Sequence, residues 1–191
     1  MPIARRRKKQ PDVLRPQLLQ SAGQLALEAG LRAVTLEAVA ARAGVSKGGL
    51  QYHFPNKQAL LDALFDETLA AFKADMLSAM AEDPDTGGRA ARGYIHASLQ
   101  ESRRNASATH LHLLLAMMLT DPETRARWSP KIVEINRPEP LPDAEAARLM
   151  ICRLAADGLW LAELLGYQSM PPSLYAEVLR QIDQMTRNNS K

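Results

Sequence analysis

The segment that most constrains how this chain can fold covers residues 35–57 and reads TLEAVAARAGVSKGGLQYHFPNK. Thr35 is a good helix N-cap, because its hydroxyl can accept a hydrogen bond from a backbone N–H that the first helical turn leaves unpaired. Gly44 can end that helix by taking the left-handed conformation that other residues avoid. Ser46 can cap a second short helix, and Asn56 can cap a third after a proline stops the second. Two short helices across a tight glycine turn form a helix-turn-helix, whose second helix would enter the major groove of DNA.

The second helix of this unit carries a polar outer face. Leu50 and Phe54 are four residues apart and face inward, which turns Lys47, Gln51 and Tyr52 outward. A buried helical hairpin without DNA contacts is the alternative interpretation. It does not explain exposed aromatic and glycine residues on so short a helix, where each glycine costs about 1 kcal/mol of helix propensity. Close approach of the backbone to a groove does explain them.

Over roughly positions 14–65 these residues resemble the signature of the tetracycline-repressor (TetR) family of bacterial regulators. The matching positions are Thr35, Val39, Ala40, Ala43, Gly44, Val45, Ser46, Gly48, Leu50, Tyr52, His53, Phe54, Asn56, Lys57 and Leu60. The resemblance implies an all-α fold of nine helices, with an N-terminal helix-turn-helix head and a C-terminal helical effector and dimerisation domain. It also implies a set of residues on the DNA, the last of them on a phosphate: Thr35, Lys47, Gly48, Gly49, Gln51, Tyr52, His53 and Lys57.

The chain departs from the family pattern at Gln51, where the family usually has a tyrosine. A phenol that would touch a phosphate is lost, and an amide that can bind adenine through two hydrogen bonds is gained. The operator preferences of the family therefore do not transfer to this chain.

Charge is distributed unevenly along the sequence. Residues 1–60 hold ten Lys and Arg against three Asp and Glu, a formal charge of +7, whereas residues 61–191 hold 14 against 18, a charge of −4. A basic head on an acidic body favours a polyanionic partner for the head alone, although a solvated charge asymmetry would give the same count.

Cysteine content and hydropathy favour a soluble protein of the reducing cytoplasm. Cys152 is the only cysteine, so no disulfide can form within the chain. The basic N-terminus is followed by Gln10, Pro11 and Asp12, where a signal peptide would need an apolar region. The longest apolar run, residues 113–119, is too short to cross a bilayer.

Helical periodicity extends along the rest of the chain. A flexible basic arm is expected over residues 1–10, the helix-turn-helix domain over 11–57, a connecting helix over 58–81, and a ligand-binding and dimerisation domain over 82–191. Outside the helix-turn-helix, the patterns predict helices at about 13–29, 56–81, 89–104, 107–119, 121–135, 143–165 and 172–187, which makes nine in all. Pro130 should kink or break the helix at 121–135. Residues 82–88 are expected to form the loop at the domain boundary.

The C-terminal helices favour a pocket and a dimer surface. Helical bundles place apolar pockets with a few polar groups between helices, and we expect such a pocket to involve Tyr94, His96, Ser98, Met117, Met118, Trp128 and Trp160. Any one of these residues could equally belong to an ordinary core. The last two helices have more apolar surface than one chain can cover, which predicts an isologous four-helix interface that includes Leu161, Leu164, Tyr175, Leu179 and Ile182.

Other chemistry is weakly supported. His110 and His112 are two residues apart and cannot share a helix face, so neither they nor His96 and Cys152 favour a metal site. We find no nucleophile elbow, phosphate-binding glycine loop or HExxH motif, so no enzyme activity and no cofactor are expected. The sequence thus predicts a homodimeric, sequence-specific repressor that an unidentified small molecule releases from double-stranded operator DNA, without a membrane partner. A non-specific DNA-binding protein and a helical enzyme or interaction module are the alternatives.

Overall fold

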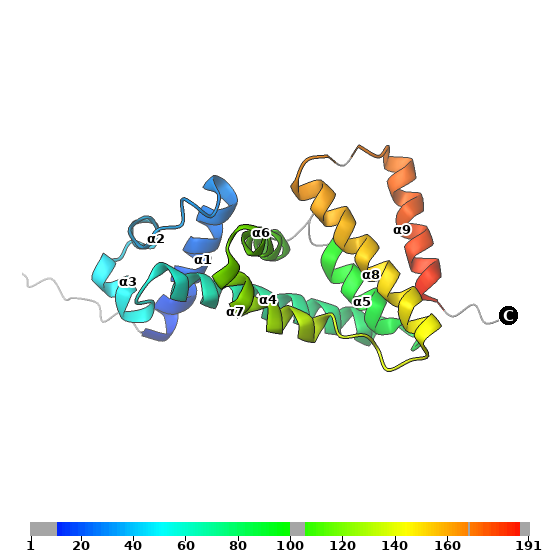
Figure 1. Ribbon diagram of the computed structural model, residues 1–191. Coiled ribbons are helices and arrows are strands. Elements are labelled where there is room, and N and C mark those ends of the chain that lie inside the picture. The colour runs from blue at the N-terminus through cyan, green and yellow to red at the C-terminus, as the bar shows by residue number, and fades with distance from the viewer. Residues whose placement is uncertain (1–10, 100–105, 168, 188–191) are drawn as a thin grey trace, which may run out of the picture. The chain divides into compact units, whose positions relative to one another are not determined.

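The structure, a computed structural model, describes residues 11–99, 106–167 and 169–187. Within these ranges it contains nine helices and no strand, so the predicted all-α fold is confirmed. The basic arm expected over residues 1–10 lies outside the described part of the chain. The helices are α1 (Pro11–Ala29), α2 (Leu36–Arg42), α3 (Lys47–His53), α4 (Lys57–Glu82), α5 (Arg89–Leu99), α6 (Ala106–Thr120), α7 (Pro122–Ile135), α8 (Asp143–Leu164) and α9 (Pro172–Thr186) (Figure 1).

The chain divides into two compact units, residues 1–67 and 68–191, and helix α4 contributes to both. The first unit contains α1, α2, α3 and the first turns of α4. Its core is apolar, because each helix turns one stripe of aliphatic or aromatic residues inward. The largest fully buried members are Leu18, Leu19, Val34, Val39, Leu50, Leu60, Leu61 and Phe65.

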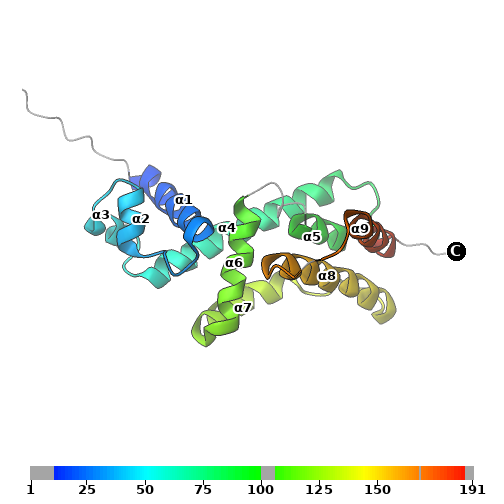
Figure 2. The same cartoon turned by 90° about the horizontal axis from the view of Figure 1, so that it is seen from above.

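In the second unit, helices α5, α8 and α9 lie side by side, and α6 packs against α7 and α8 (Figures 1 and 2). The core between α5, α8 and α9 consists of Leu99, Cys152, Ala156, Leu159 and Ile182. The thiol of Cys152 is buried, and that burial raises its pKa, so it behaves as a small apolar core group.

A buried arginine ties the start of α5 to the end of α9. Arg92 donates to the carboxylate of Asp83 at 2.6 Å and to the backbone carbonyls of Gly87 at 2.8 Å and Thr186 at 3.2 Å. Gly88 also lies against Thr186. Its φ is 66°, and a Cβ atom added to it would be 2.2 Å from the Thr186 carbonyl oxygen. This close approach requires glycine both for its backbone conformation and for its missing side chain.

The sequence predicted a kink or break at Pro130 and an α5 helix that extends to about residue 104. Pro130 neither breaks nor ends α7, which continues from Pro122 to Ile135 with the proline inside it. Asp121 caps the helix by accepting from the Glu123 N–H, and Trp128 anchors it in the core, so the rest of the helix is held despite the backbone hydrogen bond that proline cannot donate. Helix α5 is described only to Leu99, so the predicted continuation to residue 104 lies outside the described residues.

Candidate DNA-reading surface and ligand cavity

Local hydrogen bonds set the position of α3 in the first unit. The Thr35 hydroxyl accepts from the Ala38 N–H at 3.1 Å, and the Ser46 hydroxyl accepts from the Gly49 N–H at 3.1 Å. Between the two helices, Gly44 takes a φ of 65°. Both caps and the left-handed glycine are where the sequence predicted them, which makes the turn between α2 and α3 short and rigid.

Helix α3 is buried on one side and exposed on the other. Leu50 is fully buried, whereas Lys47, Gly48 and Gln51 are exposed and Tyr52 is 83% exposed. A Cβ atom added to Gly48 would meet nothing within 4 Å, so its lack of a side chain serves no contact inside this unit. An exposed phenol and amide beside a bare stretch of backbone are suited to contact with another molecule.

The charged groups around α3 differ in how freely they could meet a phosphate. Lys47 lies 2.5 Å from the carboxylate of Glu37, and its ammonium lowers the pKa of that acid. The Lys57 ammonium donates to the Leu31 carbonyl at 3.0 Å, and partial burial lowers its pKa. Lys57 therefore also holds the start of α4 against the loop after α1.

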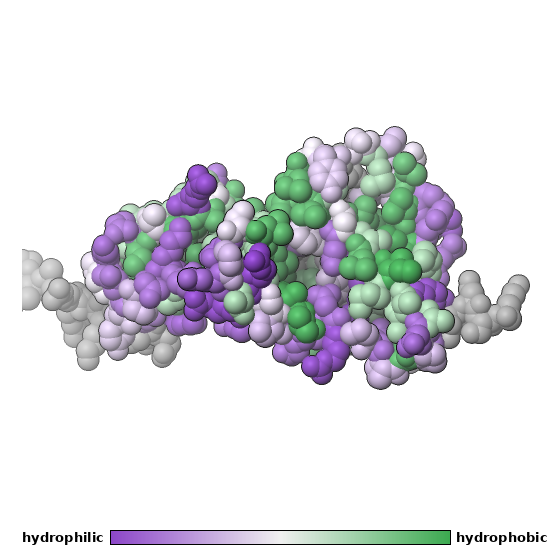
Figure 3. Space-filling view, in the orientation of Figure 1, coloured by the Kyte–Doolittle hydropathy of each residue, from purple (hydrophilic) through white to green (hydrophobic). Residues whose placement is uncertain are grey.

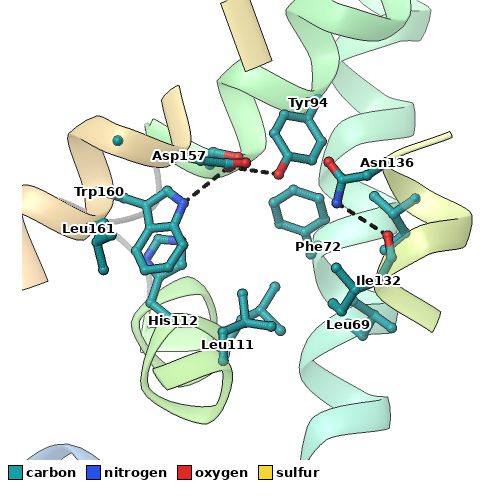
Figure 4. Close-up of a pocket in the computed structure, with 14 residues that line it drawn as sticks. Leu69, Phe72, Tyr94, Leu111, His112, Ile132, Asn136, Asp157, Trp160 and Leu161 are labelled. Carbon is teal, nitrogen blue, oxygen red and sulfur yellow. Dashed lines mark hydrogen bonds between the residues drawn. The ribbon is translucent and has the colours of Figure 1, made fainter. Parts of the chain in front are cut away.

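The second unit contains a cavity of about 280 Å³ (Figure 4). Helices α4, α5, α6, α7 and α8 all contribute to its wall. The aromatic rings of Phe72 and Tyr94 meet edge to face at 5.5 Å. The remaining lining residues are Leu69, Ser98, Leu111, His112, Leu115, Ile132, Ile135, Asn136, Asp157, Gly158, Trp160 and Leu161.

One corner of the cavity is polar. The Tyr94 hydroxyl donates to Asp157 Oδ1 at 2.8 Å, and the Trp160 Nε1–H donates to the same oxygen at 3.2 Å (Figure 4). Burial raises the pKa of Asp157, while these hydrogen bonds and the charge of Arg153 act in the opposite direction. Burial and the Asp157 carboxylate also raise the pKa of Tyr94, so the phenol stays protonated and donates.

A stacked pair forms the wall beside this corner. The rings of His112 and Trp160 lie 4.1 Å apart and 5° from parallel. Burial lowers the pKa of His112 to about 4, so the imidazole is neutral near pH 7. The histidine thus adds an aromatic surface to the cavity and no charge.

Of the residues expected in a pocket, Tyr94, Ser98 and Trp160 line this cavity. His96 lines a second cavity of about 290 Å³ instead, together with Arg92, Asp183 and Arg187. Met117, Met118 and Trp128 line neither of the two. Sequence reasoning missed Asp157, although a carboxylate three residues before a tryptophan on an apolar helix was a visible signal.

The residues expected at a dimer surface are distributed between the surface and the interior of the unit. Ile182 is buried in the core, Tyr175 and Leu179 pack partly against that core, and Leu161 lines the cavity. Leu164 is half-buried. Other apolar side chains on α8, α9 and the loop between them are exposed: Ile151, Leu154, Leu165, Tyr167, Leu174 and Met185. Apolar surface is visible over this part of the second unit in Figure 3.

The described residues offer neither a metal site of protein ligands nor a membrane-spanning helix. No group of three or more His, Cys, Asp or Glu side chains is arranged to hold a metal ion in the ranges that the structure describes. No helix in those ranges is long and apolar enough to cross a membrane.

Comparison with known families decides the identity of the fold. A family model described as the C-terminal domain of tetracyclin repressor-like proteins matches residues 88–187, just over half of the 191 residues. The model of the tetR family of bacterial regulatory proteins matches residues 18–64. The chain belongs to the TetR family. As a TetR-family protein it is a DNA-binding transcriptional regulator and not an enzyme, and regulators of this family act as dimers and bind small molecules.

Individual TetR-family proteins are similar over most of the chain. The HTH-type transcriptional regulator BetI of Klebsiella pneumoniae is 24% identical over 172 residues, which cover 85% of this chain and 88% of BetI. A transcriptional regulator from Rhodococcus sp. Rha1 shares the fold with a TM-score of 0.67 at 22% identity, over 90% of this chain and 93% of its own. A structure of the multidrug binding protein EbrR complexed with imidazole has a TM-score of 0.56 at 22% identity, over 88% and 93% of the two chains.

Proposed function

We propose that this TetR-family regulator is a cytoplasmic repressor whose operator affinity falls when a small molecule fills the cavity of about 280 Å³. The observation that carries the proposal is the continuity of helix α4. This helix begins at Lys57, shortly after α3 ends at His53, and it supplies Leu69 and Phe72 to the cavity wall. A ligand that shifts those two side chains therefore acts on the same helix that supports the DNA-reading unit.

Each exposed group of the head has a proposed role. Gln51 reads a base edge, and Lys47, Tyr52 and His53 contact the groove. The backbone of exposed Gly48 and half-buried Gly49 allows close approach. The hydroxyl of Thr35 and the ammonium of Lys57 meet phosphates. Lys57 can do so while bonded to Leu31, because an ammonium has three hydrogen atoms to donate.

The rest of the chain supplies the switch and the dimer. Residues 11–57 act as the reading domain, residues 58–81 as the connecting helix, and residues 82–191 as the ligand-binding and dimerisation domain. The dimer surface centres on the exposed apolar residues of α8, with Ile151, Leu154 and Leu165 on one helix face. A two-fold dimer must hold its two reading helices about 34–36 Å apart to enter successive major grooves, so a small tilt of α4 changes DNA affinity.

The expected loss of DNA affinity follows from the coupling free energies that are typical between two binding sites of one protein. A coupling free energy of about 1–3 kcal/mol corresponds to a loss of DNA affinity of about 5- to 150-fold. Linkage requires that operator DNA weaken ligand binding by the same factor. A ligand that binds equally well with and without operator is not an inducer.

Two measurements test the proposal. Protection mapping on the DNA that flanks the protein's own gene should show one short near-palindromic footprint, whereas a non-specific DNA-coating protein would protect nothing discrete. Calorimetric titration of a cavity ligand should then give a lower affinity in the presence of that operator fragment. A discrete footprint combined with equal ligand affinities would leave a DNA-binding regulator and reject the ligand-released mechanism.

A further inference from the structure

The wall of the cavity combines aromatic rings with a single ionisable acid. Among the described residues that line it, none is Lys or Arg, and its one imidazole, His112, is neutral near pH 7. Of the described lining residues, Asp157 is therefore the only one that can carry a charge near neutral pH. Such a wall disfavours an anion, because the described residues that line it include no cationic side chain to offset the desolvation of a second negative charge.

The guanidinium of Arg153 interacts with the Asp157 carboxylate and also with other groups. Arg153 lies on α8 one turn before Asp157 and lowers the pKa of that carboxyl. Its guanidinium is also within 3.9 Å of the Glu139 carboxylate and 3.4 Å of the Ile135 carbonyl, and it stacks 5.2 Å over the Tyr94 ring. The Arg153 guanidinium is therefore shared between the Asp157 and Glu139 carboxylates and is not paired with Asp157 alone.

The carboxylate of Asp157 also has a spare oxygen. Both of its donors, Tyr94 and Trp160, bond to Oδ1. Within the part of the chain that the structure describes, no donor reaches Oδ2, which leaves this oxygen available to a ligand. The rings of Phe72 and Trp160 line the cavity with it, and aromatic faces attract cations through their quadrupole.

We propose that the effector of this cavity is a small apolar organic cation, an ammonium or amidinium compound whose charge lies against Asp157 and the rings of Trp160 and Phe72. This inference rests on the proposed function, in which the cavity is the effector site. It excludes carboxylates, phosphates and other anions as effectors. A neutral molecule of the same shape fills the cavity more weakly, because it gains only the apolar contacts.

Three probes of similar shape and different charge separate the contribution of charge to the binding affinity from that of shape. Benzyltrimethylammonium, neopentylbenzene and benzylsulfonate each attach a tetrahedral group to a benzyl carbon, and that group is respectively positive, neutral and negative. Calorimetry on the full chain should give an affinity for the ammonium probe at least about tenfold above that for the neutral one, and the sulfonate should bind most weakly. Because this comparison uses the unaltered protein, it does not depend on the folding of any variant.

A variant then assigns the preference to one side chain. Asp157→Asn keeps an oxygen that can accept from Tyr94 and Trp160 but removes the charge. We expect its ammonium affinity to fall about tenfold to the level of the neutral probe, whose affinity should not change. Glu163→Gln, which removes an exposed acid from the same helix, is the matched control and should leave all three affinities unaltered.

The outcomes are distinct for the two proposals. Equal or tighter binding of the neutral or sulfonate probe, an ammonium preference that survives in Asp157→Asn, or no saturable binding of the ammonium probe would overturn the cation assignment. If the ammonium probe binds as expected but does not weaken operator binding, the ligand-released mechanism fails, while the preference of the cavity for a cation stands. If the sulfonate or neutral probe alone releases operator DNA, the mechanism stands and the assignment fails.

Discussion

Gln51 is the residue on which the base preference of the head depends. It is exposed on α3, and its amide can pair with both the N6 and N7 atoms of an adenine. Gln51→Ala should cost about 1–3 kcal/mol at one base position and relax the preference there. The measurement is a competition series of single-base operator variants.

Lys57→Ala serves as the comparison for this test, since the loss of a phosphate contact weakens all sequences alike. It should lower the salt dependence of binding by about one unit of slope and leave the order of operator variants unchanged. An unchanged order of operator variants with Gln51→Ala would contradict its role as a base reader.

The titration of Asp157 should be visible in ligand binding. Burial raises its pKa, and only its ionised form attracts a cation. The affinity for benzyltrimethylammonium should therefore be highest above this raised pKa and should fall as the pH is lowered through it. Tyr94 and His112, which face Asp157, do not produce the same loss, because the raised pKa of Tyr94 keeps its phenol protonated and the pKa of His112 is lowered to about 4.

Calorimetry over a pH series that runs from neutral pH down to the lowest pH at which the protein stays folded measures this dependence. In Asp157→Asn the affinity should be low and flat across that range. A wild-type affinity that does not change with pH, or that rises as the pH falls, would mean that the carboxylate does not hold the cation.

At the scale of elements, the contact between the start of α5 and the end of α9 should dominate the stability of the second unit. Gly88→Ala places a Cβ atom 2.2 Å from the Thr186 carbonyl oxygen and also strains a φ of 66°. Overpacking and left-handed strain together should cost roughly 3 kcal/mol. Urea unfolding at a fixed protein concentration measures the loss.

Gly166→Ala separates the two causes. Gly166 has a similar φ of 72°, but an added Cβ atom would meet nothing within 4 Å. We expect it to cost only about 1–2 kcal/mol, the strain of the backbone alone. Equal losses in the two variants would show that the contact with Thr186 is not tight in solution.

The elements themselves were predictable from sequence wherever their signals are local. Thr35, Gly44, Ser46 and Asn56 act within a few residues of their own position, so caps and turns could be located without tertiary information. At Pro130 the sequence predicted a kink or a break, and the helix does not break, because whether a proline ends a helix depends on what holds the next turn, and that is a tertiary property.

The cavity was harder to predict, because its wall depends on how five helices are rotated. Tyr94 and Ser98 are four residues apart and face it together, whereas His96 lies between them on the opposite side of α5 and lines the second cavity. Likewise Leu111 and Leu115 of α6 face the cavity, and the methionines that follow them do not. Residue chemistry indicated a pocket, but only the packing shows which turn of each helix faces it.

At the scale of the whole molecule, the exposed apolar face of α8 should be covered in the dimer. Leu154 is 60% exposed in the single chain. Leu154→Glu should therefore yield monomers in light scattering at micromolar concentrations, since a buried interface cannot hold an unpaired carboxylate. A dimer of unchanged stability would mean that the subunits meet elsewhere.

Val133→Glu is the matched control for this prediction. Val133 is 64% exposed on α7, a helix that the proposed dimer surface does not include. The same substitution there should leave the dimer intact. Monomers from both variants would indicate general destabilisation of the second unit rather than loss of one interface.

The link between Arg92 and Thr186 also has a consequence for how the protein is made. The two residues are 94 positions apart, and the acceptor lies in α9, the last helix described. Ribosomes extend a chain from its N-terminus at roughly 5–20 residues per second, and domains tend to fold in that order. The first unit can therefore fold while later residues are still being added. In the second unit, by contrast, the buried guanidinium of Arg92 lacks the Thr186 carbonyl as an acceptor until α9 has emerged. The packing of the second unit is therefore completed only when its last described helix is made, after the residues of the first unit have had time to fold.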